Sequence, residues 1–256
     1  MLKIQILVAT MNQDDYSLPE KMNIRTEAIV GNQCDRNSVE EFQYMGNKIK
    51  YLNFSETGVG LNRNNALMRA DADIVLFADD DMVYLDDYKD KIENAFSNNP
   101  QADVVLFNLK EKIPTRKIIE KPHNVGYLNY LRYGTARMAI RLSSVKKNGI
   151  LFNLCFGGGT EYSHGEDNLF LNNCLKKGLK IIAVPEYIAE LVDDRKSTWN
   201  NGYDYKYLTD QGVLYRALSR NYWKILCLQD AIRRHKSYNK GWVEAYRIMK
   251  KGANKF

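Results

Sequence analysis

The sequence predicts an α/β protein, with a mostly parallel sheet flanked by helices and a basic helical extension at the C-terminus. Short apolar runs rich in branched side chains alternate with amphipathic segments, which favours a parallel sheet. Asp79, Asp80 and Asp81 directly follow one such run, a position typical of ligand-binding residues at the carboxyl end of a buried strand. Residues 216–256 contain 11 Lys or Arg and only two acidic residues, so this segment differs in character from the rest.

The strands are expected where apolar runs are short and bounded by polar or turn-forming residues. The first run is too short for a signal peptide and is therefore interpreted as the first strand. The expected strands lie near residues 3–9, 27–31, 48–53, 73–78, 103–108 and 179–184. Because they alternate with helical segments, we expect their carboxyl ends to meet at one edge of a sheet.

Helices are expected where apolar residues recur at helical spacing. They lie near residues 12–22, 38–45, 61–70, 85–97 and 166–177. Gly178 follows the last of these segments, as a C-cap glycine does. The polar segment 110–126 contains Pro114 and Pro122, which indicates a connection or a short hairpin.

Length and composition indicate two parts, an α/β domain over residues 1–215 and a basic amphipathic helical tail over residues 216–256. The hydrophobic content of 45% is sufficient for a sizeable core. The four cysteines show no paired or metal-binding spacing, which indicates reduced thiols and a cytoplasmic location. No apolar stretch reaches the length of a membrane span.

The three aspartates are the first candidate site. Carboxylates packed at a strand end repel one another unless a cation neutralises them, and oxygen ligands suit Mg²⁺ or Mn²⁺. The alternative interpretation is a helix N-terminus, where aspartates cap free N–H groups. Both interpretations stay open on the aspartates alone.

A second candidate is the segment 58–70, in which Asn62 and Asn64 can cap a helix and Gly58 and Gly60 allow close approach to a ligand. Arg63 would lie in the first turn of that helix, where its charge opposes the helix dipole. An anionic neighbour explains such a cation best, either the aspartates or a phosphate. A solvated surface arginine is the alternative.

A third candidate combines three glycines with two acids. Residues 157–159 are all glycine, which marks a close approach to a ligand or a mobile loop. Glu166 and Asp167 then begin an apparent helix, and adjacent side chains on a helix do not face the same way. One acid can therefore point into a cleft as a general base while the other anchors the loop. Helix capping is again the alternative.

Together these features resemble family 2 glycosyltransferases with the GT-A (Rossmann-like) fold, over roughly residues 1–215. The resemblance rests on a first strand ending in Ala9 and Thr10, the Gly-x-x-Arg-Asn segment 60–64, the run 77–81 and the later Gly-Glu-Asp of residues 165–167. It implies an inverting, metal-dependent transfer of a sugar from a nucleotide-diphosphate donor to a saccharide or lipid-linked acceptor in surface polysaccharide synthesis. The resemblance also implies UDP as the nucleotide of the donor, since UDP-sugars are usual donors in this family.

The resemblance also implies roles for single residues. In the Asp-x-Asp (DXD) motif, Asp79 and Asp81 would hold Mn²⁺ or Mg²⁺, and Asp79 and Asp80 would contact the donor diphosphate together with Arg63. Asp167 would be the general base and Glu166 an acceptor-binding or orienting residue. The acceptor side would be lined by Gly157 and Gly158.

Nucleotide contacts are implied at the ends of the first two strands. The candidate residues are Ala9, Thr10, Asn32, Gln33 and Asp35. Many relatives supply a further metal ligand as a C-terminal histidine, but the corresponding segment 192–199 has none. Asp193 or Asp194 could substitute, water could complete the metal shell, or the two acids could be an ordinary solvated cluster.

The basic tail admits two interpretations. Its Lys and Arg residues are interleaved with Trp223, Ile225, Leu226, Leu228, Ile232 and Trp242. This pattern suits peripheral contact with an anionic membrane on its cytoplasmic face, next to a lipid-linked acceptor. The alternative is a helix that packs its apolar side on the domain and solvates its basic side.

Three other functions make different demands on the sequence. A sugar nucleotidyltransferase would carry a Gly-rich basic loop after the first strand, which residues 9–15 lack. A non-catalytic module would use the basic tail to bind a nucleotide, nucleic acid or membrane, but residues 1–215 are acidic and contain no known nucleic-acid motif, so nucleic acid is not expected. A glycosidase would use two carboxylates without a metal or a diphosphate-binding arginine.

Overall fold

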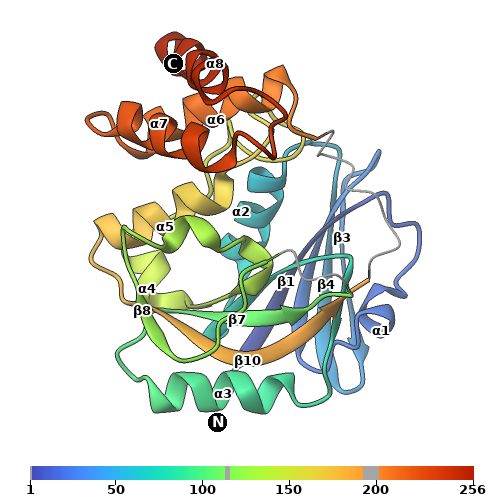
Figure 1. Cartoon of the computed structure of the whole chain (residues 1–256). Coiled ribbons are helices and arrows are strands. Elements are labelled where there is room, and N and C mark those ends of the chain that lie inside the picture. Colours follow the sequence, from blue (N-terminus) through green and yellow to red (C-terminus); the bar gives the residue numbers. More distant parts are fainter. Residues whose placement is uncertain (1, 113–115, 193–201) are drawn as a thin grey trace.

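The computed structural model describes residues 2–112, 116–192 and 202–256. Within these ranges the chain forms a ten-stranded sheet that curves around the centre of the molecule (Figure 1). The strands are β1 (Ile4–Met11), β2 (Glu27–Gln33), β3 (Ser38–Tyr44), β4 (Asn47–Phe54), β5 (Ile74–Asp79), β6 (Met82–Tyr84), β7 (Val104–Lys110), β8 (His123–Val125), β9 (Met138–Arg141) and β10 (Ile181–Leu191). They are ordered β3-β4-β2-β1-β5-β9-β7-β10-β6, and β8 pairs with β10.

The central strands are mostly parallel, as predicted. β1 pairs in parallel with both β2 and β5, and β7 pairs in parallel with β10. β9 was not predicted, and it lies between β5 and β7 antiparallel to both. The carboxyl ends of β1 and β5 therefore meet at the same edge of the sheet, with Ala9 opposite Asp79.

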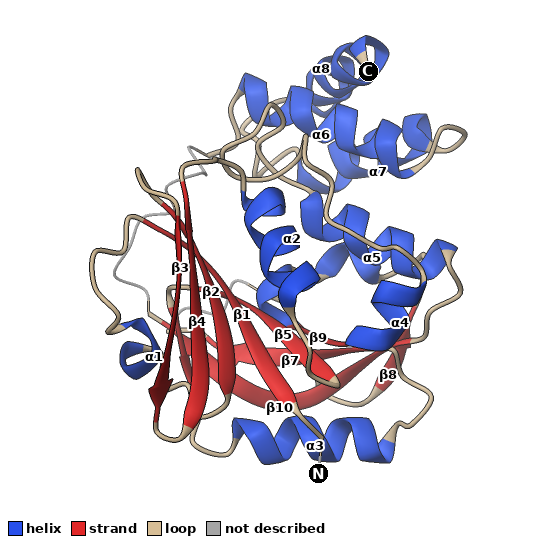
Figure 2. Cartoon of the chain, turned by 180° about the vertical axis from the view of Figure 1, so that it is seen from behind, coloured by secondary structure: helices blue, strands red, loops and turns tan. Residues whose placement is uncertain are grey.

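Helices cover both faces of the sheet (Figure 2). Three lie on one face, namely α2 (Val59–Arg69), α4 (Leu142–Lys147) and α5 (Glu166–Lys176). The other face carries α1 (Leu18–Lys21) and α3 (Tyr88–Asn98). Each face has its own apolar core, because successive side chains of a strand point to opposite sides: Leu7 lies in one core, Ile6 and Val8 in the other.

Two predicted helices are wrong. Residues 38–45 were expected to be helical but form β3, whose side chains alternate between half-buried and exposed. Met45 and Gly46 both have positive φ, and this tight turn joins β3 to β4 in a hairpin. Of the helix expected at residues 12–22 only α1 forms, since Asn12 is left-handed and Gln13 is held by the side chain of Asn32.

The C-terminal part contains three helices that stand above one end of the sheet (Figure 1), α6 (Tyr205–Leu218), α7 (Trp223–Arg234) and α8 (Trp242–Lys255). α6 and α8 cross closely, because a Cβ atom on Gly212 would lie 1.8 Å from the Met249 carbonyl oxygen. The expected boundary after residue 215 lies inside α6, and the division into two domains stays a prediction.

The apolar residues of the tail lie in α7 and α8, and they differ in exposure. Trp223 is buried, whereas Ile225, Ile232 and Trp242 are exposed. Among the described residues, no helix has both the length and the apolar composition needed to cross a bilayer.

Candidate active site

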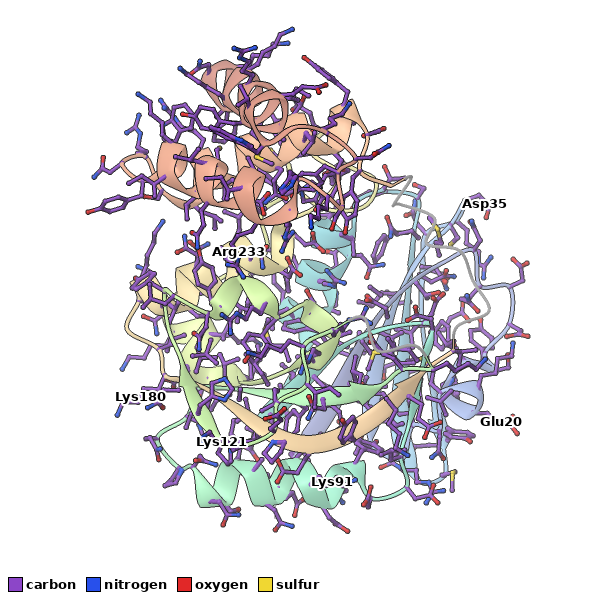
Figure 3. All side chains as sticks on the ribbon, viewed as in Figure 1. Glu20, Asp35, Lys91, Lys121, Lys180 and Arg233 are labelled. Atoms are coloured by element: carbon purple, nitrogen blue, oxygen red, sulfur yellow. The ribbon has the colours of Figure 1, made fainter. Side chains whose placement is uncertain are left out.

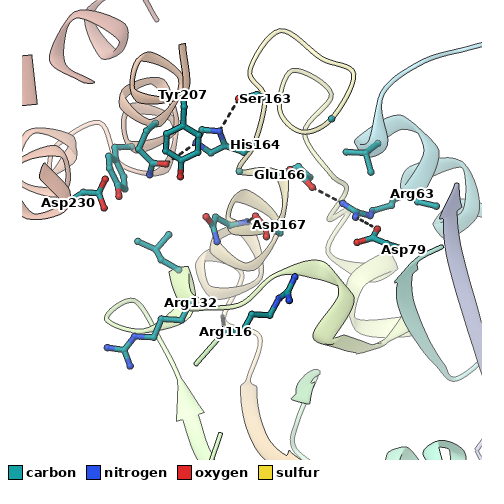
Figure 4. Close-up of a pocket in the computed structure, with 18 of the residues that line it drawn as sticks. Arg63, Asp79, Arg116, Arg132, Ser163, His164, Glu166, Asp167, Tyr207 and Asp230 are labelled. Atoms are coloured by element: carbon teal, nitrogen blue, oxygen red, sulfur yellow. Dashed lines mark hydrogen bonds and ion pairs between the residues drawn. The ribbon is translucent and has the colours of Figure 1, made fainter. Parts of the chain in front are cut away.

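A cleft of about 860 Å³ opens where the carboxyl ends of β1 and β5 face the loop before α5 and the helices α6 and α7. Figure 4 shows its centre: Arg63 and Asp79 lie at one end, Asp230 and Arg132 at the other, with Glu166 and Asp167 between them. The second and third candidate segments of the sequence therefore meet the aspartates in one place.

Arg63 joins the two acidic motifs. It is 5% exposed, and its terminal nitrogens donate to Asp79 Oδ1 at 2.7 Å and to Glu166 Oε1 at 2.8 Å. Its guanidinium also lies over the Phe152 ring, 5.5 Å from the centroid. Of the two partners that the sequence left open for Arg63, the structure shows the carboxylates. The arginine therefore fixes the distance between the end of β5 and the start of α5.

The other two aspartates have different surroundings. Asp80 Oδ2 accepts a hydrogen bond of 2.6 Å from the Thr10 hydroxyl, so the ends of β1 and β5 are joined by side chains as well as by backbone. Burial raises the pKa of Asp81, and the negative charges of Asp79 and Asp80 raise it further. The helix-cap interpretation is wrong for this motif, because β6 rather than a helix follows it.

The aspartates fit a hard divalent cation in their chemistry. Asp79 keeps one oxygen beyond the one bonded to Arg63, and the crowding that raises the pKa of Asp81 is the repulsion that a cation relieves. Within the described ranges, no three His, Cys, Asp or Glu side chains form a ready metal-binding cluster. Asp193 and Asp194, the alternative ligands, lie outside the described residues.

Asp167 lies in the first turn of α5, next to the middle of the cleft. Gly165 precedes the helix with φ of 105°, a conformation that favours glycine. Asp167 Oδ1 accepts a 2.6 Å hydrogen bond from the backbone N–H of Asn168, and a Cβ atom on Gly134 would lie 3.3 Å from Oδ2. Burial, and then the charge of Glu166, raise the pKa of Asp167 to about 7. A carboxyl group with this pKa can accept a proton near neutral pH.

The two predicted acceptor-side glycines differ in position. Gly158 lines the cleft, and its carbonyl oxygen accepts a 2.9 Å hydrogen bond from the backbone N–H of Val59 at the start of α2. Gly157 does not line the cleft but has φ of 103°, and a Cβ atom there would lie 2.8 Å from Glu166 Oε2. The loop thus packs against the acid that Arg63 holds.

The predicted nucleotide contacts separate into two groups. Ala9, Thr10 and Gln33 line the cleft, and Gln33 Oε1 accepts a 2.7 Å hydrogen bond from the Gly58 N–H. Asn32 is fully buried and bonds to Gln13 and to another side chain, so it supports the loop after β1 from behind. Asp35 is exposed at the edge of the molecule and is not a lining residue (Figure 3).

The sequence did not predict the lining at the α7 end of the cleft. One wall is the segment 127–132, which includes the short η1 (Tyr130–Arg132) and leads through η2 (Thr135–Arg137) into β9. The opposite wall is formed by α6 and α7 and by residues 163–164 before α5. The concentration of tyrosines in residues 127–133 and the arginine pair at 233–234 were the available signals.

An aromatic pair belongs to this second wall. The His164 ring stacks on Tyr207 with centroids 4.3 Å apart, and its Nε2 lies 2.8 Å from Gln211 Oε1. Burial lowers the pKa of His164, so its neutral form is favoured at pH 7. Stacked rings with polar edges suit a sugar ring.

Among the comparisons with known proteins, one shows a family and another shows similar folds. The family model described as Glycosyl transferase family 2 matches residues 23–152. The structure of S. aureus TarS 1-349 in complex with UDP-GlcNAc is similar with a TM-score of 0.64 and 15% identity, over 99% of this chain and 92% of that chain. For the complex of TarS 1-349 with UDP the TM-score is 0.61 and the identity 20%, over 91% and 72% of the two chains.

The longer S. aureus TarS structure has a TM-score of 0.63 and 17% identity, over 98% of this chain and 55% of that chain. A search of curated protein sequences found no match. At these identities the likeness concerns the fold, and it confirms the predicted GT-A architecture with its helical C-terminal extension.

Proposed function

The chain belongs to glycosyl transferase family 2 and is a glycosyltransferase, and we propose that it moves a sugar from a UDP-sugar, with inversion, to a hydroxyl group of a saccharide or lipid-linked acceptor. One observation carries the proposal: Asp167, whose pKa is raised to about 7, lies between the aspartates of β5 and the α7 end of a single cleft (Figure 4). A base in this position can take the proton of an acceptor hydroxyl that attacks a donor bound beside the aspartates.

On the donor side, Asp79 and Asp81 would hold Mn²⁺ or Mg²⁺, which when bound supplies positive charge to the leaving diphosphate. Asp80, Ala9, Thr10 and Gln33 would contact the donor, with Asn32 acting indirectly through the loop that it supports. Asp35 remains a predicted contact. The UDP assignment is supported by analogy, because the similar TarS 1-349 structures contain UDP-GlcNAc or UDP.

The role predicted for Arg63 at the donor diphosphate fits another arginine better. Arg63 has both terminal nitrogens bonded to carboxylates, so its role is to hold Asp79 and Glu166 in place. Arg116 lines the cleft, and its positive charge offsets a small part of the rise in the pKa of Asp81 that burial and the other two aspartates cause, so this charge lies near the DXD motif. It is the better candidate to contact the diphosphate.

On the acceptor side, Glu166 would orient the loop while Asp167 removes the proton. Gly158 would border the acceptor, and Gly157 would act by letting the loop approach Glu166. His164 and Tyr207 would offer a stacked surface to a sugar ring. Water has to be kept from the donor, because hydrolysis competes with transfer.

The biological setting proposed is surface polysaccharide or glycan synthesis at the cytoplasmic face of a membrane. Exposed Ile225, Ile232 and Trp242, together with the basic side chains of residues 216–256, support peripheral membrane contact.

The deciding experiment is a thermal stability assay with a panel of nucleoside diphosphates, with and without Mn²⁺. A ligand that binds only the folded chain raises the melting temperature by mass action. We expect a Mn²⁺-dependent rise with UDP that Asp81→Ala abolishes and that Asp86→Ala, an exposed carboxylate outside the cleft, preserves. No rise with any nucleotide would contradict the proposal and favour a non-catalytic binding module.

A further inference from the structure

Charge is segregated along the cleft. Around the DXD motif and the start of α5 the lining contains five carboxylates with Arg63 and Arg116, so carboxylates are in excess there. The α7 end contains Arg132, Arg233 and Arg234 with a single acid, Asp230. Figure 4 shows Arg132 and Asp230 on the far side of Asp167 from Asp79. The excess of carboxylates at one end suits a bound cation. By the same reasoning, the excess of arginines at the α7 end suits a bound anion.

Asp230 does not neutralise this basic end. Its Oδ1 forms an ion pair with Arg234 Nε at 3.2 Å, and its Oδ2 accepts a hydrogen bond of 2.5 Å from the Tyr238 hydroxyl. Arg234 and Asp230 therefore pair within α7, and the bond from Tyr238 holds α7 to the turn after it. One carboxylate with both oxygens engaged leaves the other arginines uncompensated.

Arg132 and Arg233 are those uncompensated arginines. Both side chains are exposed, and neither forms an ion pair or a side-chain hydrogen bond with any residue in the described part of the chain. They come from opposite walls, Arg132 from η1 and Arg233 from the side of α7 that faces α5 (Figure 3). Two planar guanidinium groups on facing walls are suited to the oxygens of phosphate groups.

Neutral polar side chains lie next to these arginines and can bind uncharged groups of a ligand. Gln229 offers an amide group and Tyr127 a hydroxyl group on the two walls of the same region, whereas the amide of Asn129 is bonded to the backbone of its own loop. Such groups bind the hydroxyl groups of a sugar or polyol. The lining therefore combines sites for anions with sites for neutral hydroxyls.

We propose that the α7 end of the cleft is a phosphate subsite, in which Arg132 and Arg233 bind phosphate groups of the acceptor and thereby present one of its hydroxyls to Asp167. The role of this subsite in sugar transfer rests on the proposed function, whereas the binding of phosphate by the two arginines does not. The phosphate belongs either to a phosphodiester chain or to a lipid carrier, and the two sources share this chemistry.

The test measures binding of a fluorescein-labelled glycerol phosphate oligomer by anisotropy over a range of salt concentrations, with and without UDP and Mn²⁺. A labelled maltoheptaose is the uncharged comparison. Each of Arg132→Gln and Arg233→Gln is expected to weaken oligomer binding about tenfold and to flatten its salt dependence. Arg132→Lys should restore only part of the loss, because lysine keeps the charge without the planar fork.

The matched control is Arg69→Gln, an exposed arginine at the end of α2 outside the cleft, which should bind the oligomer as the wild type does. Flotation with vesicles of phosphatidylglycerol or phosphatidylcholine separates the two sources. Arginine-dependent binding to the anionic vesicles alone indicates a lipid phosphate, and arginine-dependent binding to the oligomer alone indicates a soluble phosphodiester.

Wild-type affinity in both cleft variants, an equal loss in the Arg69→Gln control, or equal affinity for maltoheptaose would each overturn the phosphate subsite. Binding of UDP tests the proposed donor site independently of the phosphate subsite. A wild-type protein that binds the oligomer through the two arginines but shows no UDP binding would refute the proposed donor and leave the subsite standing.

Discussion

Replacing the proposed base by asparagine should make the protein inactive and, at alkaline pH, more stable. Asp167→Asn removes the carboxylate proposed to accept the acceptor proton, and Glu166 beside it is already bonded to Arg63, so transfer should fall at least about 100-fold. The amide oxygen of asparagine can still accept the 2.6 Å hydrogen bond from Asn168 N–H, so the helix start is preserved. The expected gain in the free energy of unfolding follows from the raised pKa of Asp167.

The pKa of Asp167 is raised from 3.8 to about 7, first by burial and second by the charge of Glu166. Between these values the folded state binds more protons than the unfolded state, so stability falls as pH rises from about 4 to about 7. The full shift corresponds to about 4 kcal/mol at most, and solvent at the open cleft reduces it. We expect Asp167→Asn to gain about 1 to 3 kcal/mol at pH 8.

The assay is urea denaturation of both proteins at pH 5 and pH 8, with Asp14→Asn, an exposed carboxylate, as the control. The gain of Asp167→Asn should be less than half as large at pH 5, because much of the transition in proton binding lies above that pH. A gain of the same size at both pH values, or a loss at pH 8, would refute the reasoning about burial. Full transfer activity in this variant would remove Asp167 from the role of base.

Three further results are expected. Arg63→Met leaves two carboxylates without their buried partner and should lower the free energy of unfolding by about 3 kcal/mol, measured by urea denaturation at pH 7.5. Glu166→Gln removes a charge that raises the pKa of Asp167, so the rise of kcat with pH, which should occur near pH 7 in the wild type, should move about one pH unit lower. Gly212→Ala places a Cβ atom against the Met249 carbonyl oxygen and should lower the melting temperature by about 3 to 9 °C in calorimetry.

The arginine and glycine variants each have a control in the same chain. Arg69→Met lies on the same helix as Arg63 but is exposed, and Gly126→Ala meets no atom within 4 Å. Either control behaving like its test variant would show that the effect comes from helix propensity or loop entropy rather than from the contacts named. An unchanged pH profile in Glu166→Gln would mean that burial alone sets the pKa.

The fold was predicted where local pattern and tertiary environment agree. The strand before the DXD motif, the helix around Arg63 and the helix after Gly165 were all predicted, because their apolar spacing matches the face that they bury. β3 was mistaken for a helix because its acids and exposed side chains follow no apolar alternation, and its identity depends on the turn at Met45 and Gly46. β9 was missed because four residues are too few for a periodic signal.

The candidate site was predicted on its donor side and largely missed at its α7 end. Asp79, Asp80, Asp81, Glu166 and Asp167 stand next to glycines or strand ends, so each carries a local signal. The α7-end residues carry none of that kind, because they become neighbours only when α7 folds over the segment before β9. Likewise, the pairing of Arg63 with two carboxylates depends on residues 16 and 103 positions away.

The orientation of β9 affects which parts of the chain can be exchanged between relatives. The residues that follow the parallel strands β1 and β5 line the cleft. β9 runs in the opposite direction, so the residues that line the cleft beside it are those that precede the strand. That segment is fixed at one end by β8 and at the other by β9. A chimera that swaps residues 126–134 would therefore replace one wall of the cleft as a cassette, leaving every strand and the DXD motif in place.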